Sequence, residues 1–401
     1  MKKVLFVIRE LSGGGAERAL SNIMENFPAD WEMDILMNNR EYIDFPCKAN
    51  VLSLDIPEPK NRNAISYQIW MIIKRTWYLR KLKKENHYVA SVSFLDTSNI
   101  SNVLSGNKHC KTIISVRNML TKQSGMPVRI CTYLLMRMLY CHADKIVAVS
   151  REIGGDIHRR YHIKEDKITA IVNGYDSEKI DQDASKELQD TQEAALFATH
   201  PVIVAVGRLT QQKGQWHLIR AFQKVVEQIP EARLYLLGSG DMQEYLEKLI
   251  QNLGLQEKVK LNGFANNPFQ YIRNAACYVM PSLYEGYPNA LAEAVCCDAA
   301  CIAADFHSGA REILAPQMDV LGERTREMTE MSYGILTPIC SGRRYEGQEP
   351  LEHAEQCLAD AMVEMLQNGE KRRYYQNQSK IRKEDLDIKT VVQKWVDTIT
   401  E

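Results

Sequence analysis

With 401 residues, 45% of them hydrophobic and 25% charged, the chain exceeds the size at which one hydrophobic core stops growing, so two domains are expected. The formal net charge is −1, and no recognised nucleic-acid-binding motif accompanies the basic residues of the N-terminal half, which argues against nucleic acid as a partner. The ten cysteines show no paired C-x-x-C spacing and no Cys/His cluster typical of zinc, so we expect a reduced, cytoplasmic chain.

Short apolar runs, each followed by a polar or glycine-rich turn and then a helical pattern, recur along the chain. Such runs predict parallel strands that alternate with helices on both faces of a sheet. The first series is expected at residues 4–8, 88–94, 112–116 and 146–149, and the second at 202–206, 234–237, 259–261 and 277–280. The first run is too short for a signal peptide or a membrane span. The predicted fold class is α/β, with two doubly wound domains.

The two series are separated by an acidic, polar stretch at 176–200, which is typical of an interdomain connection. We therefore expect an N-terminal domain at 1–180, a linker at 181–200 and a C-terminal domain at 201–379, with a helix at about 380–401 that can pack back on the first domain. Residues 315–331 are polar and weakly periodic, and we expect them to form a surface insertion.

A glycine-rich segment, SGGGAER at residues 12–18, directly follows the first expected strand and opens a helix. Gly14 and Gly15 would let the backbone approach a ligand, and the helix start would present N–H groups suited to a phosphate or a sugar oxygen. A tight turn without a ligand is the alternative. A dinucleotide cofactor is not expected, because the G-x-G-x-x-G spacing is missing.

The first strand of the second series ends in VGRLTQQKG, residues 206–214. Arg208 and Lys213 would converge there on a diphosphate, because ligands of open parallel sheets bind at the carboxyl ends of strands. A pair of solvated surface cations is the alternative.

The third segment, PSLYEGYPNALAE at residues 281–293, follows the last strand of the second series. Pro288 suits the first turn of a helix, which would leave free N–H groups facing an anion. Those N–H groups belong to Asn289, Ala290 and Leu291. Glu285 lies ahead of this helix and Glu293 lies inside it, so one carboxylate could accept hydrogen bonds from a ribose and the other from a sugar. Glu293 has mostly apolar neighbours, where a carboxylate needs a partner.

Glu285 and Glu293 enclose seven residues, and with GGGAER and GRLTQQKG before them the chain resembles the retaining glycosyltransferases of family 4. The resemblance covers nearly the whole chain and implies a GT-B fold, in which two Rossmann-like domains face each other across a cleft. It implies transfer of a hexose or an N-acetylhexosamine from a UDP-sugar to a glycan or polyprenyl-linked acceptor, in the synthesis of cell-surface polysaccharide.

The resemblance also implies roles for single residues. Arg208 and Lys213 would neutralise the donor diphosphate, Glu285 would contact the transferred sugar, and Glu293 would hold the ribose. The other residues implied in donor binding are Gly14, Gly15, Gly207, Phe264, Asn267, Gly286, Tyr287, Pro288, Asn289, Ala290 and Leu291. We expect no metal and no cofactor beyond the donor, because the two cations and a helix N-terminus can stabilise the leaving diphosphate.

One position departs from the family pattern. Many members carry a histidine just after the strand that lies here at 112–116, where this chain has Arg117 and Asn118. A contact with the sugar or the acceptor could pass to either residue. His307, in a later loop, is expected to be an ordinary loop histidine.

Residues 60–88 interleave aromatic and basic side chains, as expected of a helix that lies on an anionic membrane, and the Met- and Leu-rich segment 126–140 is a second candidate. The alternative is that both are amphipathic helices packed on the first sheet with basic rims. Either interpretation permits a lipid-linked acceptor and peripheral attachment to the inner face of the cell membrane.

Three other functions would use a similar donor site. A nucleotide-sugar epimerase would need acid and base residues across the cleft, and a phosphorylase would need a lysine for pyridoxal phosphate. A non-catalytic binding protein would be expected to lose the charged donor residues, all of which are present here. The sequence therefore favours a glycosyltransferase.

Overall fold

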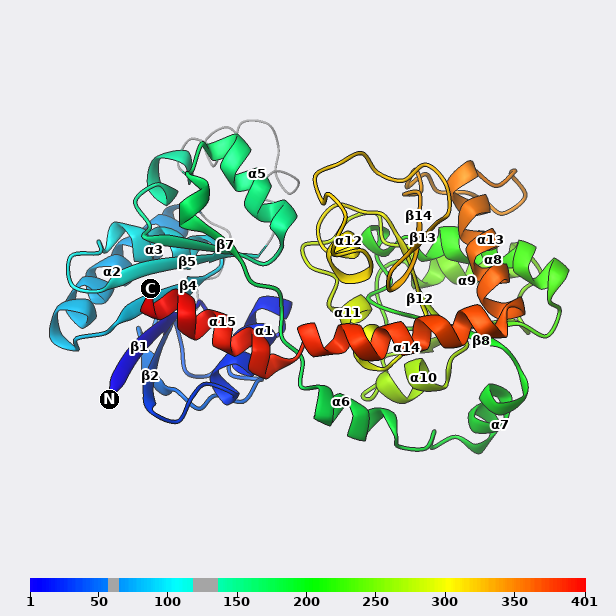
Figure 1. Cartoon of the computed structure of the whole chain (residues 1–401), viewed down its shortest axis with the longest axis horizontal. Coiled ribbons are helices and arrows are strands. Elements are labelled where there is room, and N and C mark those ends of the chain that lie inside the picture. Colours follow the sequence, from blue (N-terminus) through cyan, green and yellow to red (C-terminus); the bar gives the residue numbers. More distant parts are fainter. Residues whose placement is uncertain (57–64, 118–135) are drawn as a thin grey trace. The chain divides into compact units, whose positions relative to one another are not determined.

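The computed structural model describes residues 1–56, 65–117 and 136–401. The chain divides into two compact units (Figure 1). Unit 1 contains Met1–Gly174 and Ile388–Glu401, and unit 2 contains Tyr175–Asp387. Each unit has its own sheet and core, which confirms the expected α/β class with two doubly wound sheets.

Unit 1 is built on a seven-stranded parallel sheet with the order β3-β2-β1-β4-β5-β6-β7. Its strands are β1 (Lys2–Val7), β2 (Trp31–Met37), β3 (Asn50–Ser53), β4 (Ala90–Phe94), β5 (Lys111–Val116), β6 (Lys145–Ala148) and β7 (Ile168–Ala170). Its helices in the described ranges are α1 (Gly15–Glu25), α2 (Ile65–Glu85), α3 (Asp96–Leu104), α5 (Arg151–Tyr161) and α15 (Ile388–Thr400). The central strands are continuous apolar runs because helices cover both faces of a parallel sheet.

Unit 2 repeats this plan with the order β10-β9-β8-β11-β12-β14-β13, in which only β13 runs antiparallel to its neighbour. Its strands are β8 (Val202–Val206), β9 (Arg233–Leu237), β10 (Val259–Gly263), β11 (Cys277–Met280), β12 (Cys301–Ala304), β13 (Thr329–Met331) and β14 (Gly334–Thr337). Its α-helices are α6 (Ser177–Ala184), α7 (Thr191–Thr199), α8 (Gln215–Gln228), α9 (Gln243–Asn252), α10 (Phe269–Asn274), α11 (Asn289–Cys296), α12 (Ala310–Leu314), α13 (His353–Gln367) and α14 (Gly369–Asp385).

All eight strands predicted from the apolar runs are present, whereas the pattern missed β2, β3 and β7 in unit 1. The strand β2 carries Asp34 in a buried position, where Asn50 Nδ2 and the hydroxyl of Tyr88 donate to its carboxylate. The other two missed strands are short and only partly buried, so they leave little apolar signal.

The acidic stretch at 181–200, expected to be a linker, lies within unit 2 as parts of α6 and α7. Asp181 forms ion pairs with Arg273 and Lys383, and Glu193 pairs with Lys260. These two acidic side chains are therefore partners of basic groups on the unit rather than solvated linker residues. The chain passes between the units at Gly174–Tyr175 and again at Asp387–Ile388, so of the expected C-terminal helix only the part from residue 388 belongs to unit 1.

The segment 315–331, expected to be a surface insertion, contains the edge strand β13 and is anchored by a buried arginine. Arg311 donates two hydrogen bonds to the carboxylate of Asp305, at 2.9 and 2.7 Å, and further bonds to the carbonyls of Asp319 and Gly322. This buried side chain fixes a segment whose own sequence has little apolar character.

The long helix α2 covers most of the aromatic segment 60–88, and it packs on unit 1 through one face only. Its opposite face exposes Ile69, Trp70, Ile73 and Trp77 by 45–65%. Two of the basic residues expected at the surface, Arg75 and Lys83, are instead buried. In the second segment, 126–140, residues 126–135 lie outside the described residues. Among the helices that the structure describes, none combines the length and the apolar character needed to cross a membrane.

Helix α15 completes the core of unit 1, where it lies beside the sheet (Figure 1). Trp395 is almost fully buried, and its ring centroid lies 5.5 Å from that of Phe94 in β4. The C-terminal residues of the chain therefore stabilise the unit that contains the N-terminus.

Replacing this tryptophan should destabilise unit 1 selectively. We expect Trp395→Ala to lower the free energy of unfolding of unit 1 by about 3–5 kcal/mol, because it leaves a large cavity between α15 and the sheet. Hydrogen exchange in increasing urea reports on peptides of each unit separately. The exposed Trp77→Ala is the matched control and should change stability by less than about 0.5 kcal/mol. Equal effects of the two substitutions would contradict the assigned packing.

Candidate functional site

The candidate site lies at the carboxyl edge of the sheet in unit 2. Strands β8 and β11 are parallel neighbours, although more than 70 residues separate them in the sequence. The loops that follow them, at residues 207–214 and 281–288, therefore meet at the same edge. They are joined by a backbone hydrogen bond of 2.9 Å from Leu283 N to Gln212 O.

An ion pair joins the two loops. Lys213 Nζ lies 2.6 Å from Glu285 Oε1, and both side chains are largely buried, with exposures of 16% and 8%. The same carboxylate accepts hydrogen bonds from Gln212 Nε2 at 3.0 Å and from Ser282 Oγ at 2.9 Å. Both residues were predicted to bind a ligand, and the structure shows them bound to each other.

Arg208 lies at the same edge directly after β8, and its side chain is exposed. Its carbonyl accepts a hydrogen bond from Gln215 Nε2 at 2.9 Å, which fixes the backbone. Within the described part of the chain, no acidic side chain pairs with its guanidinium. Since Glu285 balances the charge of Lys213, Arg208 gives this edge a local positive charge.

The glutamate-rich segment is only partly helical. Helix α11 begins at Asn289, and Pro288 is its N-cap rather than a residue of its first turn. The N–H groups of Asn289 and Leu291 donate to the carbonyls of Tyr287 and Pro288, at 3.0 Å each. The tight first turn therefore uses both of these N–H groups, which were predicted to face a ligand. Glu293 lies farther along α11 and is 92% buried, with 8% exposed.

The loop after β12 supports this segment from one side. A β-carbon at Gly309 would clash with the ring of Pro288, so the two loops approach as closely as a glycine permits. The hydroxyl of Ser308 donates to the carbonyl of Gly286. Tyr287 is buried, and its ring lies near Gly309. Gly286, Tyr287 and Pro288 are thereby held in one conformation.

Asn289 is fixed from the other side. Its Oδ1 accepts a hydrogen bond of 2.7 Å from the hydroxyl of Tyr175, the first residue of unit 2. The N–H of Tyr175 in turn donates to the carbonyl of Leu386, close to where the chain leaves the unit. The start of α11 is therefore connected to both points at which the chain enters and leaves unit 2.

Phe264 and Asn267 follow β10, at the same edge of the sheet. Phe264 is 79% exposed, as expected of a ring that could contact a ligand. Asn267 is engaged within the fold instead. Its Nδ2 donates to Asp183 O at 2.7 Å, and its Oδ1 accepts from the N–H of Phe269 at 3.2 Å. Asn267 therefore joins α6 to the start of α10.

The residues predicted in unit 1 lie at the start of α1 and at the end of β5. Gly14 is the N-cap of α1, and the carboxylate of Glu17 lies against it, where burial raises the pKa of that carboxyl. Arg117 is buried, donates to Asn173 Oδ1 and lies 5.7 Å from the ring centroid of Phe94. Gly15 is the first residue of α1. Asn118 lies outside the described residues.

Two buried arginine networks were missed by the sequence reasoning. Besides the pair of Arg311 and Asp305, Arg220 is fully buried and donates to both carboxylate oxygens of Glu355. It also donates to the carbonyls of Gly347, Glu349 and Pro350, which holds the loop before α13. An arginine inside an otherwise apolar helix face, as in WHLIRAF, was the available signal.

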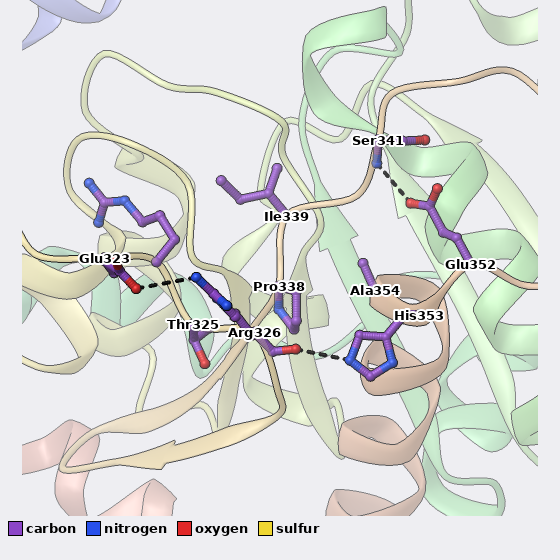
Figure 2. Close-up of a pocket in the computed structure, with 10 residues that line it drawn as sticks. Glu323, Thr325, Arg326, Pro338, Ile339, Ser341, Glu352, His353 and Ala354 are labelled. Carbon is purple, nitrogen blue, oxygen red and sulfur yellow. Dashed lines mark hydrogen bonds and ion pairs between the residues drawn. The ribbon is translucent and has the colours of Figure 1, made fainter.

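A pocket of about 750 Å³ opens beyond the carboxyl end of β14 (Figure 2). It is lined by residues 323–326, 338, 339, 341 and 352–354, none of which was predicted to bind a ligand. Arg324, one of the lining residues, donates to His307 Nδ1 at 2.8 Å, so that histidine is engaged in a loop contact.

Two groups of side chains in the described residues have the spacing needed to hold a metal, and neither includes a predicted donor residue. The first comprises His217, Cys340 and Glu352, and the second comprises Glu327, His353 and Cys357. In the first group His217 is already satisfied, because Nδ1 lies 2.7 Å from Glu355 and Nε2 accepts the N–H of Gly342 at 3.2 Å.

Two family models match the chain, one in each half. The model described as Glycosyltransferase Family 4 matches residues 13–179, and the model described as Glycosyl transferases group 1 matches residues 187–328. An uncharacterized glycosyltransferase of Methanocaldococcus jannaschii is 32% identical over 350 residues, which cover 84% of this chain and 85% of that protein.

A second relative, from Campylobacter jejuni, is 26% identical over 394 residues and covers 96% of both chains. It is named N-acetylgalactosamine-N,N'-diacetylbacillosaminyl-diphospho-undecaprenol 4-alpha-N-acetylgalactosaminyltransferase. The crystal structure of HepE from Anabaena in complex with UDP and glucose is similar over 100% of both chains, with a TM-score of 0.71 and 18% identity. This likeness confirms the expected GT-B fold.

The contact between the two loops can be tested at Gly214. This residue has φ +64°, and a β-carbon on it would lie 2.5 Å from the carbonyl oxygen of Pro281. Gly254 has nearly the same φ, +66°, and open space around it. Gly254→Ala should cost roughly 1–2 kcal/mol of unfolding free energy for its backbone conformation, whereas Gly214→Ala should cost at least about 1 kcal/mol more for the clash.

Urea unfolding of the two variants, followed by hydrogen exchange in unit 2, gives the difference directly. If both substitutions lower the free energy of unfolding by the same amount, the loops at 207–214 and 281–288 do not approach each other as the structure shows.

Proposed function

We propose that this chain, which belongs to the glycosyltransferases that combine a family 4 domain with a group 1 domain, transfers a hexose or an N-acetylhexosamine from a UDP-sugar to a polyprenyl-linked glycan. We further propose that the transfer retains the anomeric configuration and needs no metal. The main support for this proposal is the arrangement at the carboxyl edge of the sheet in unit 2, where Arg208 and the ion pair of Lys213 and Glu285 lie together.

A diphosphate suits the charge at this edge. Arg208 is a guanidinium that can form two parallel hydrogen bonds to phosphate oxygens. Lys213 has three N–H donors, and the bond to Glu285 uses one of them, so Nζ can also donate to a phosphate. Each such charge-assisted bond is worth about 1.5–3 kcal/mol.

The two carboxylates suit the hydroxyl groups of the donor. Glu285 is held by Gln212, Lys213 and Ser282, so its orientation is set before a ligand binds. A carboxylate held in this way can accept hydrogen bonds from sugar hydroxyls without loss of side-chain entropy. We assign Glu285 to the transferred sugar and Glu293 to the ribose.

The choice of donor and acceptor is supported by relatives. The structure of HepE was determined with UDP and glucose, which supports UDP as the nucleotide. The Campylobacter jejuni relative is named for a diphospho-undecaprenol acceptor and for N-acetylgalactosamine as the sugar transferred, which supports a polyprenyl-linked acceptor.

In the proposed reaction the bond between the anomeric carbon and the UDP oxygen breaks, and a bond to the acceptor oxygen forms on the same face of the sugar. The acceptor proton passes to the leaving phosphate. Arg208 and Lys213 stabilise the negative charge that develops on the UDP, which is the role that a metal ion would otherwise fill.

Donor turnover tests these assignments. Purified protein with UDP-sugars and a polyprenyl-diphosphate glycan should release UDP from one donor, and only when the acceptor is present. Lys213→Ala and Glu285→Gln should each lower kcat/KM by about 100-fold or more, because each removes a charge from the donor site. Added EDTA should leave the rate unchanged.

The control variant is Lys224→Ala, which removes a partly exposed lysine that pairs with Asp360 on α13. It should keep full activity. Full activity of the Lys213 and Glu285 variants would overturn the assigned site. Without an acceptor, UDP release would point to hydrolysis, and conversion of the UDP-sugar to another UDP-sugar would point to epimerisation.

A lipid-linked acceptor requires access to a membrane, for which we propose the exposed face of α2. Ile69, Trp70, Ile73 and Trp77 lie on this face at helical spacing, and Lys74 Nζ lies 5.3 Å from the ring centroid of Trp70. Apolar and aromatic side chains next to cations are typical of helices that lie in a membrane interface.

Vesicle sedimentation tests this surface. The protein should bind vesicles of phosphatidylglycerol more tightly than vesicles of phosphatidylcholine, and Trp70→Ser with Trp77→Ser should weaken binding at least 10-fold. Tyr374→Ser, which changes an aromatic side chain 53% exposed on unit 2, is the control. Unchanged binding by the double variant would show that α2 is not the contact surface.

A further inference from the structure

Three side chains with metal-binding chemistry meet where the anchored segment before β13 contacts α13. His353 and Cys357 are four residues apart and share one face of the helix. Glu327 comes from the segment before β13. His353 Nε2 lies 3.2 Å from Glu327 Oε1, and Cys357 Sγ lies 3.6 Å from His353 Nε2 and 3.7 Å from Glu327 Oε2.

The separation of 3.6 Å between Cys357 Sγ and His353 Nε2 matches an edge of a tetrahedral zinc site, and the two oxygens of Glu327 lie near its other edges, one 3.2 Å from the nitrogen and the other 3.7 Å from the sulfur. With Zn–N and Zn–O bonds of about 2.1 Å and a Zn–S bond of about 2.3 Å, tetrahedral angles place ligand nitrogen and oxygen about 3.4 Å apart and sulfur about 3.6 Å from either. One ligand atom from each of the three side chains lies within 4.8 Å of the others, so the three can reach a common ion. Imidazole, thiolate and carboxylate together are a ligand set that zinc prefers.

We propose that Glu327, His353 and Cys357 form a binding site for Zn²⁺. The thiol of Cys357 would release its proton to solvent when it becomes a ligand, and His353 would carry its proton on Nδ1, because Nε2 would bind the ion instead of donating to the carbonyl of Arg326. A water molecule or the carbonyl of Arg326, which lies 2.9 Å from His353 Nε2, would complete the tetrahedron. The proposal goes beyond sugar transfer and is independent of it, because no residue assigned to the donor belongs to this group.

The ion would fix one wall of the pocket beyond β14. His353 lines this pocket, and so do residues 323–326, which directly precede Glu327 (Figure 2). Figure 2 shows the imidazole of His353 directed at the carbonyl of Arg326. Arg311 already holds the start of this segment through the carbonyls of Asp319 and Gly322. A zinc ion at Glu327 would hold its other end against α13.

The cluster formed by His217, Cys340 and Glu352 does not compete for this assignment. There both nitrogens of His217 have partners, and the side chain is fully buried. In the proposed site His353 and Glu327 are exposed, so an ion can reach them from solvent.

Metal titration of the full chain tests the proposal. After treatment with EDTA and removal of the chelator, the protein should bind one Zn²⁺, measured by competition with a chromophoric chelator. Co²⁺ in its place should give the near-ultraviolet absorption of a thiolate-to-cobalt transition. His353→Gln and Glu327→Gln change exposed side chains and should each weaken Zn²⁺ binding at least 10-fold.

Cys357→Ser should abolish the thiolate absorption, whereas Cys141→Ser, which changes an exposed cysteine outside the group, should not. Zn²⁺ should also slow hydrogen exchange in residues 321–331 of the unmodified protein and not of His353→Gln. The proposal is overturned if the unmodified protein binds no Zn²⁺, or if the His353 and Glu327 variants bind it as tightly as the unmodified chain does. UDP release by these variants should stay unchanged, so failure of this site and failure of the donor site are distinguishable.

Discussion

The parallel pairing of β8 with β11 is the constraint on which the candidate site depends. It brings two loops to one edge of the sheet, where the largely buried ion pair of Lys213 and Glu285 joins them. A buried ion pair is stabilising only when its remaining hydrogen bonds are satisfied, and here Gln212 and Ser282 satisfy the carboxylate. The chief role of the pair is therefore to hold two charged groups at fixed positions on this edge. Arg208 lies on the same loop as Lys213, and no acidic side chain of the described residues pairs with it.

The loops farther from these two strands are held by arginines rather than by apolar contacts. Arg220 and Arg311 are buried, and each combines a carboxylate with several backbone carbonyls as partners. One guanidinium has five N–H donors, so it can donate hydrogen bonds to several carbonyl groups of a loop that would otherwise be buried without partners. The segments they hold lie next in the chain to two of the stretches that line the pocket beyond β14, 323–326 and 352–354, and two ligands of the proposed zinc site, Glu327 and His353, lie at or next to these stretches.

Two helices of unit 1, α15 and α2, differ in the kinds of side chain that they bury and expose. Helix α15 buries an aromatic side chain, Trp395, and completes the core. Helix α2 buries Arg75 and Lys83 and exposes two tryptophans, the reverse of what composition alone suggests. Lys83 can be buried because its Nζ donates to the carbonyls of Asn102 and Gly106 and to the hydroxyl of Thr112. Burial lowers the pKa of this amine to about 8, and the three hydrogen bonds take the place of the water that the buried amine has lost.

The amino-acid sequence by itself determined the fold class, the eight main strands and the segments that meet at the carboxyl edge of unit 2, because strand periodicity and glycine-rich turns are local properties. Only the tertiary structure decided that Lys213 pairs with Glu285, that Asn267 and Asn289 bond within the fold, and that the acidic stretch at 181–200 belongs to unit 2. It alone brought Glu327 next to His353 and Cys357. These outcomes depend on which strands and helices become neighbours, and that choice is made by packing between residues far apart in the chain.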